Sequence, residues 1–114
     1  MQYLTGYWEI KQVKKDNKIL KTYTISTIVD YFEVHKDMTG FRKKVAPNLD
    51  GKFIVNDHKS PFRLEIEDDK LHIYYTQNDT EFKETIVKAS KKELIITNQE
   101  QVLYIYKPYQ PITF

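Results

Sequence analysis

Apolar and polar residues alternate along much of this chain with the period of two that is typical of β-strands. In residues 62–67 (FRLEIE) the apolar side chains share one face and the charged side chains the other, and residues 71–75 (LHIYY) also place apolar side chains on a shared face. Residues 102–106 (VLYIY) are apolar or aromatic on both faces. We therefore expect that last segment to be covered on both sides, or to close a sheet on itself.

Turn-forming clusters separate these segments at short and even intervals, and the segments between them are rich in Val, Ile, Thr, Tyr and Phe. In residues 81–87, Phe82 and Ile86 are four positions apart, a spacing that also fits a helix. The β-branched run 85–87 nevertheless favours a strand. No segment holds a helical period. The pattern predicts an all-β fold, a single antiparallel up-and-down β-barrel of about eight to ten short strands.

The two ends of the chain indicate how such a barrel closes. Gly6 and Trp8 stand at the start of the first predicted strand, and residues 104–107 (YIYK) end the last one, which Pro108 terminates. We expect Trp8 to point inward at a closed end of the barrel, with Lys107 covering its ring in a cation–π contact. Gly6, Trp8 and Lys107 are thus predicted to close the barrel, with the first and last strands as neighbours.

Composition narrows the class of protein. A chain of 114 residues forms one domain, predicted to span residues 1–114, and its 40% hydrophobic residues are enough for a core. The net charge is only +2, from 18 basic and 16 acidic residues, which is too balanced for a nucleic-acid partner. No apolar run reaches transmembrane length, and the chain has no cysteine.

Several segments together resemble the small lipocalin-like proteins of Bacteroidota, a family of uncharacterised proteins that includes putative lipoproteins. Their order and spacing carry the resemblance: LTGYWEI (4–10), YFEV (31–34), GFRKKV (40–45), Pro47 with DGKF (50–53), LHIYY (71–75), FKETI (82–86) and YIYK (104–107). The resemblance implies a lipocalin-like barrel. It also implies a cell-envelope location, in the periplasm or as an outer-membrane lipoprotein, if an export signal has been removed. Otherwise the sequence, which shows no signal peptide, predicts a cytoplasmic protein.

The sequence shows no constellation of catalytic or metal-binding residues. The three histidines form neither a His-x-His pair nor a helical pair, and no serine lies in a nucleophile elbow. With three glycines in all, the chain has no glycine-rich phosphate loop. We therefore predict no catalytic residues, no metal, no cofactor and no enzymatic activity.

Two features point to the interior of the barrel. The first is a set of charges on strands with apolar neighbours, where Arg42 or Lys43 could pair with Glu84 inside the barrel; the alternative is a rim position at which these long side chains reach water. The second is the surplus of nine tyrosines, whose rings and hydroxyls suit a ligand cavity as well as strands in general. The predicted lumen residues are Arg42, Lys43, Tyr75, Glu84 and Tyr104.

We interpret the chain as a non-enzymatic binding module that holds a small apolar or amphipathic ligand in the barrel. The alternative is a structural or protein-interaction domain of the cell envelope whose barrel is filled by its own side chains, with an envelope protein as its partner. An enzyme in a barrel cavity is a third class, without residues to support it. A cavity of about 300 Å³ or more favours ligand binding, and a packed lumen favours the alternative.

Overall fold

The computed structural model describes residues 3–23, 29–47, 53–55, 59–77 and 79–109, and ten strands account for most of them. The strands are β1 (Gly6–Lys15), β2 (Lys18–Thr22), β3 (Val29–Val34), β4 (Thr39–Pro47), β5 (Phe53–Val55), β6 (Ser60–Glu67), β7 (Lys70–Gln77), β8 (Thr80–Ala89), β9 (Leu94–Thr97) and β10 (Leu103–Pro108).

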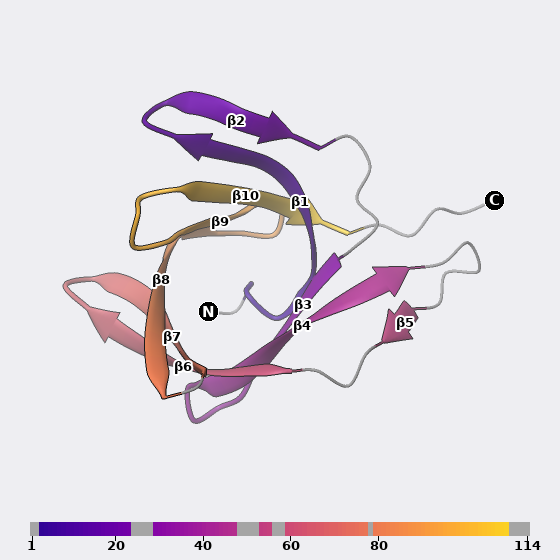
Figure 1. The fold of residues 1–114 in the computed structure, drawn as a ribbon. Coiled ribbons are helices and arrows are strands. Elements are labelled where there is room, and N and C mark those ends of the chain that lie inside the picture. Colours follow the sequence, from indigo (N-terminus) through magenta and orange to yellow (C-terminus); the bar gives the residue numbers. More distant parts are fainter. Residues whose placement is uncertain (1–2, 24–28, 48–52, 56–58, 78, 110–114) are drawn as a thin grey trace.

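Eight of the strands form a closed antiparallel barrel, in the order β1, β3, β4, β6, β7, β8, β9 and β10, with β10 paired back to β1. Figure 1 looks into this ring of strands. β2 and β5 lie outside the ring, where β2 pairs with β1 and β5 pairs with β4. The predicted all-β, mostly up-and-down antiparallel barrel is confirmed, and the predicted strand at residues 81–87 lies within β8.

β1 takes part in both the barrel and the hairpin outside it. Its first residues, Gly6 to Trp8, pair with β3, whereas its second half, from Gln12 onward, pairs with β2. The register against β10 shifts between Ile10 and Gln12, which marks a β-bulge. Bulges increase local twist and bend a strand, and this one lies where β1 leaves β3 for β2.

The core lies inside the ring. Phe32, from β3, and Ile73, from β7, are fully buried, and Leu4 packs into the same core from the segment that precedes β1. The complete cluster of buried residues is Leu4, Trp8, Phe32, Phe62, Leu64, Ile73, Tyr75, Leu94, Ile96 and Tyr106. The members of this cluster that lie on strands alternate with outward-facing positions, as the pattern of the sequence predicts.

Two glycines have a conformational or steric role. A Cβ at Gly40 would lie 2.0 Å from the carbonyl oxygen of Glu33 and 2.9 Å from the ring of Phe62, so only glycine lets β4 approach both neighbours this closely. Gly6 has a φ of +144°, a conformation that residues with a Cβ rarely adopt.

Trp8 lies inside the barrel as predicted, but Lys107 does not cover its ring. Trp8 is buried and its indole N–H donates a hydrogen bond to the carbonyl oxygen of Leu4 at 2.9 Å. However, Trp8 lies opposite Pro108 on β10, whereas Lys107 lies opposite Glu9, on the other face of the sheet. The expectation that Lys107 covers the indole is wrong because strand alternation directs the lysine outward.

Candidate ligand-binding cavity

A cavity of about 740 Å³ lies between β4, the start of β6, β7, β8 and the turn that joins β9 to β10. Arg42, Tyr75 and Glu84 line it, and these three side chains come from different strands of the ring. Phe82 contributes an aromatic wall, and Asn98 belongs to the turn. The cavity therefore shares its wall with the buried core, since Tyr75 belongs to both.

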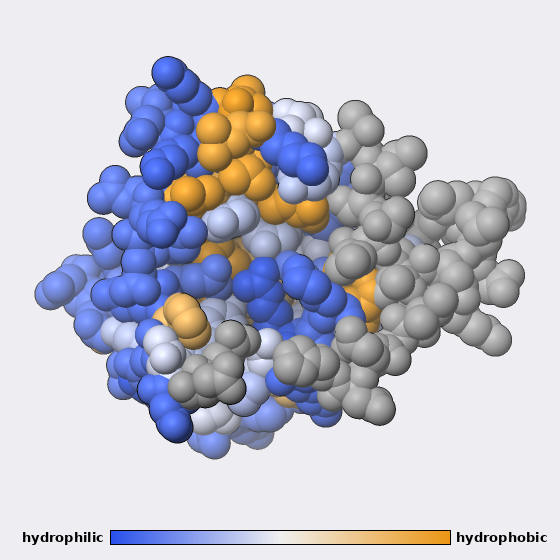
Figure 2. Space-filling model, in the orientation of Figure 1, coloured by the Kyte–Doolittle hydropathy of each residue, from blue (hydrophilic) through white to orange (hydrophobic). Residues whose placement is uncertain are grey.

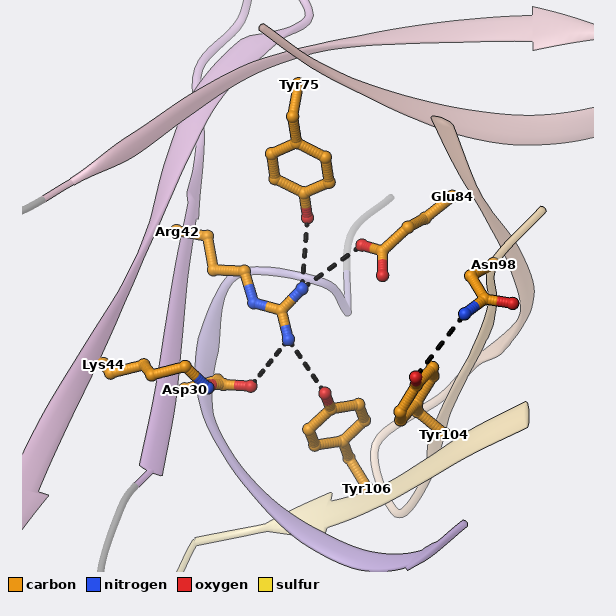
Figure 3. Close-up of polar contacts among 8 residues, drawn as sticks. All are labelled: Asp30, Arg42, Lys44, Tyr75, Glu84, Asn98, Tyr104 and Tyr106. Carbon is orange, nitrogen blue, oxygen red and sulfur yellow. Dashed lines mark hydrogen bonds and ion pairs between the residues drawn. The ribbon is translucent and has the colours of Figure 1, made fainter. Parts of the chain in front are cut away.

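Arg42 is the centre of a polar network at the wall of this cavity (Figure 3). One terminal nitrogen, Nη1, donates to the hydroxyl of Tyr75 at 3.3 Å and to Oε1 of Glu84 at 3.2 Å. The other, Nη2, donates to Oδ2 of Asp30 at 2.7 Å and to the hydroxyl of Tyr106 at 2.8 Å. A single guanidinium therefore joins strands β3, β4, β7, β8 and β10.

The network continues to Lys44, whose ammonium donates to Oδ1 of Asp30 at 3.2 Å. The side chain of Asp30 is 7% exposed and that of Arg42 is 17% exposed, whereas that of Lys44 is 65% exposed. Positive and negative groups alternate from Lys44 through Asp30 and Arg42 to Glu84. Each buried charge therefore has a partner of opposite sign, as burial requires.

The network shifts the pKa of Asp30 in the direction that keeps this carboxylate charged, and the pKa values of Tyr75 and Tyr106 rise so that these tyrosines stay neutral. Burial alone would raise the pKa of Asp30, but the charges and hydrogen bonds of Arg42 and Lys44 outweigh it, and the pKa lies below its usual range. Burial raises the pKa of both Tyr75 and Tyr106 well above the ordinary value, despite the opposing charge of Arg42. These hydroxyls are therefore neutral groups at physiological pH.

Aromatic rings of the core contact the side chains of the network. Arg42 lies directly opposite Phe32 in the pairing of β3 with β4, and its guanidinium carbon is 4.8 Å from the centre of that ring. Tyr75 packs edge-on against Phe62, with 5.8 Å between ring centres. These contacts fix the network to the core, because the rings that contact it also belong to the buried cluster.

The structure places the predicted lumen residues in different surroundings. Arg42 and Glu84 form the predicted interior pair, and Tyr75 joins them. Tyr104 is half-buried beside the core, and its hydroxyl accepts a hydrogen bond from Asn98 at 3.5 Å (Figure 3). Lys43 borders the cavity, but its ammonium lies 6.0 Å from the centre of the Tyr31 ring and does not pair with Glu84. Their roles in ligand binding stay predictions.

Two members of the network, Asp30 and Tyr106, were not among the predicted lumen residues. The signal for Asp30 is present in the sequence: it stands two positions before Phe32 in the strand VDYFEV, so alternation directs both side chains inward. Tyr106 shares a face with the predicted lumen residue Tyr104, but the opposite face of this strand is apolar as well, so alternation alone does not identify the inner face.

The described residues contain no group of three or more His, Cys, Asp and Glu that could hold a metal ion. The one buried histidine among them, His72, shares a hydrogen bond of 2.8 Å with the hydroxyl of Thr85 through Nδ1. No helix in the described part of the chain has the length and apolar character needed to cross a membrane.

A closed eight-stranded antiparallel barrel with a cavity at its wall is the architecture of lipocalin-like proteins. Residues 4–96 match the family described as "Lipocalin-like domain", and the chain belongs to this family. A crystal structure of an uncharacterized protein from Bacteroides eggerthii is similar over 93% of this chain and 99% of that protein, with a TM-score of 0.54 and 14% sequence identity. That likeness concerns the fold.

Among curated proteins, the chain is similar to phosphoribosylaminoimidazole-succinocarboxamide synthases from two Wolbachia pipientis strains, wPip and wMel, with 31% and 30% identity over 87 residues. The match covers 74% of this chain but 35% of each synthase. The chain thus spans about a third of the length of these curated relatives.

Proposed function

We propose that this protein is a non-enzymatic binding module that holds one small amphipathic molecule in the cavity of its barrel. The observation that carries the proposal is the cavity of about 740 Å³ with a polar network at its wall. This volume falls within the range of about 300–1,000 Å³ that small-molecule sites occupy. A barrel filled entirely by its own side chains would have no room of this size.

The composition of the wall supports an amphipathic ligand. Tyr75 and Phe82 offer aromatic surface, whereas Arg42 and Glu84 offer charge within the same cavity. The buried network is already hydrogen-bonded, so it is rigid before a ligand arrives. A preformed site loses less entropy on binding than one that has to be ordered.

The alternative, a structural or interaction domain, draws on a different observation. Ile19 and Leu20 on β2 are 58% and 59% exposed, and Figure 2 shows apolar surface, in orange, at the edge of the molecule where Figure 1 places β2. This surface could bind an apolar probe without any role for the barrel. The test of the proposal must therefore separate the two sites. A location in the cell envelope stays a prediction from the family resemblance.

The experiment titrates the native protein with N-phenyl-1-naphthylamine, a neutral fluorescent probe, at neutral pH. We expect saturable binding of one probe molecule and energy transfer from Trp8, the sole tryptophan. Ser60, which lies opposite Arg42 and lines the cavity, is changed to phenylalanine so that the ring occupies part of the cavity. The matched surface variant, Ile19→Ser with Leu20→Ser, removes the exposed apolar pair.

If the probe binds in the barrel, Ser60→Phe should lower the affinity for the probe by at least about tenfold, whereas the β2 variant should bind it with the affinity of the unchanged protein. A cooperative thermal unfolding transition serves as the control that each variant is folded. If the β2 variant loses the probe and Ser60→Phe keeps it, or if neither the protein nor its variants bind any probe, the proposal is wrong.

A further inference from the structure

The arginine in this cavity has no free hydrogen-bonding capacity at its two terminal nitrogens. Nη1 and Nη2 carry four hydrogens, and four acceptors meet them: the hydroxyls of Tyr75 and Tyr106 and the carboxylates of Asp30 and Glu84. A ligand carboxylate could pair with Nη1 or Nη2 only by displacing one of these partners. Displacement would leave a partly buried carboxylate or hydroxyl unpaired.

The charges around Arg42 also act against an anion. Asp30 and Glu84 flank the guanidinium on two sides, as Figure 3 shows. A carboxylate brought to the wall would lie beside groups of its own sign. Like charges brought together at a binding site are a recurrent means of rejecting a ligand.

The lysines that border the cavity do not reverse this balance. Lys43 directs its ammonium to the ring of Tyr31, on the outer face of the barrel. Lys83 lies opposite Tyr74 in the sheet, on the same outer face. Lys44 is paired with Asp30, and its side chain is mostly exposed, so water and salt weaken its attraction for an anion.

Glu84 remains the charged group best placed to contact a ligand. Its side chain is 20% exposed at the cavity wall, and one carboxylate can accept about four hydrogen bonds. Tyr75 and Phe82 lie opposite each other on β7 and β8, so their rings share the inner face beside Glu84. A carboxylate beside aromatic rings is a combination that attracts an organic cation.

We infer that the cavity selects an alkylammonium amphiphile, with its head group at Glu84 and its apolar chain against Tyr75 and Phe82, and rejects the matching fatty acid. This inference rests on the proposed binding function. It assigns Arg42 a positioning role: the guanidinium holds Glu84 in place and does not itself bind the ligand's head group.

The test compares three ligands of equal chain length: decylamine, decanol and decanoate. Each competes with N-phenyl-1-naphthylamine at pH 7 and about 0.15 M salt, below the concentration at which it forms micelles. We expect decylamine to bind at least about tenfold more tightly than decanoate, with decanol between them. The Glu84→Gln variant should lower the affinity for decylamine to that for decanol and leave the affinity for decanol unchanged.

A second variant tests whether Lys44 affects the preference among the three ligands. Lys44→Gln should leave the order of the three ligands unchanged, because Lys44 has no part in binding the ammonium group. Tighter binding of decanoate than of decylamine, above all if Lys44→Gln abolishes it, would overturn the inference while leaving a ligand-binding barrel intact. An unchanged preference for decylamine in Glu84→Gln would overturn the role of Glu84. Failure of all three ligands and of the probe would instead contradict the proposed function.

Discussion

Arg42 connects more strands of the barrel than any single backbone pairing can. Its partners Asp30, Tyr75, Glu84 and Tyr106 come from four strands other than its own. These contacts are not equivalent, because Asp30 is the more buried carboxylate and also holds Lys44, whereas Glu84 is partly open to the cavity. The two carboxylates should therefore contribute differently to stability.

Replacement of Asp30 by alanine should lower the free energy of unfolding by about 3–5 kcal/mol, since it removes one partner from a buried ion pair. Glu84→Ala should cost less, about 1–3 kcal/mol, because Arg42 keeps Asp30 as its partner. Urea denaturation of the two variants measures the difference. Equal losses, or a larger loss for Glu84→Ala, would mean that Asp30 is not the principal partner of Arg42.

The pKa of Asp30 also gives the stability a dependence on pH. Because this pKa is lower in the folded protein than in the unfolded chain, Asp30 contributes its full stabilisation above the unfolded value of about 3.9. The contribution is lost as the pH falls through the folded value. The free energy of unfolding should therefore decrease below about pH 4, and more steeply for the unchanged protein than for Asp30→Asn. Parallel curves for the two proteins would contradict this account.

Sequence patterns could predict some of these residues and not others. Alternation along β8 predicts Glu84 on an apolar face, between Phe82 and Ile86, and the sequence of β4 offers either Arg42 or Lys43 as its partner. Which of two adjacent cations faces inward was left open, since residues 41–45 contain no unambiguous inner face. The strand pairing decides it: Arg42 lies opposite Phe32, a buried residue, whereas Lys43 lies opposite Tyr31.

At the scale of elements, β1 and β10 close the barrel as the ends of the sequence predict. The register of this closure was not predictable from the sequence, because the bulge between Ile10 and Gln12 shifts the pairing. The β2 strand outside the ring was not foreseen as a separate feature. Its Lys18 and Lys21 are exposed and discourage pairing with further strands, a common protection for an edge strand.

The closure predicts unequal roles for Trp8 and Lys107. Trp8→Ala should destabilise the protein by about 3–5 kcal/mol, because it removes a large buried side chain that also donates a hydrogen bond to Leu4. Lys107→Ala should change the free energy of unfolding by at most about 0.5 kcal/mol, since this side chain faces outward. Chemical denaturation tests both. A loss for Lys107→Ala close to that of Trp8→Ala would show that the lysine does cover the indole.

At the scale of the whole molecule, the barrel interior is divided between a packed core and a cavity. The sequence predicted the barrel from periodicity, since the side-chain pattern of a strand follows directly from its residues. The cavity could not be predicted in this way, because its volume depends on how inward side chains from several strands meet. Phe82 illustrates the limit: it is 45% exposed and borders the cavity, although alternation alone would bury it beside Ile86.

The most direct test of a ligand-binding barrel is to map where an amphiphile binds, by recording backbone amide chemical shifts of the labelled protein during titration with decylamine. We expect saturable shifts centred on Tyr75, Phe82 and Glu84 and extending to Asn98 at the cavity border. Amides of Ile19 and Leu20 on β2 should stay unchanged. Shifts confined to β2, with none at the cavity, would mean that the barrel does not hold the ligand.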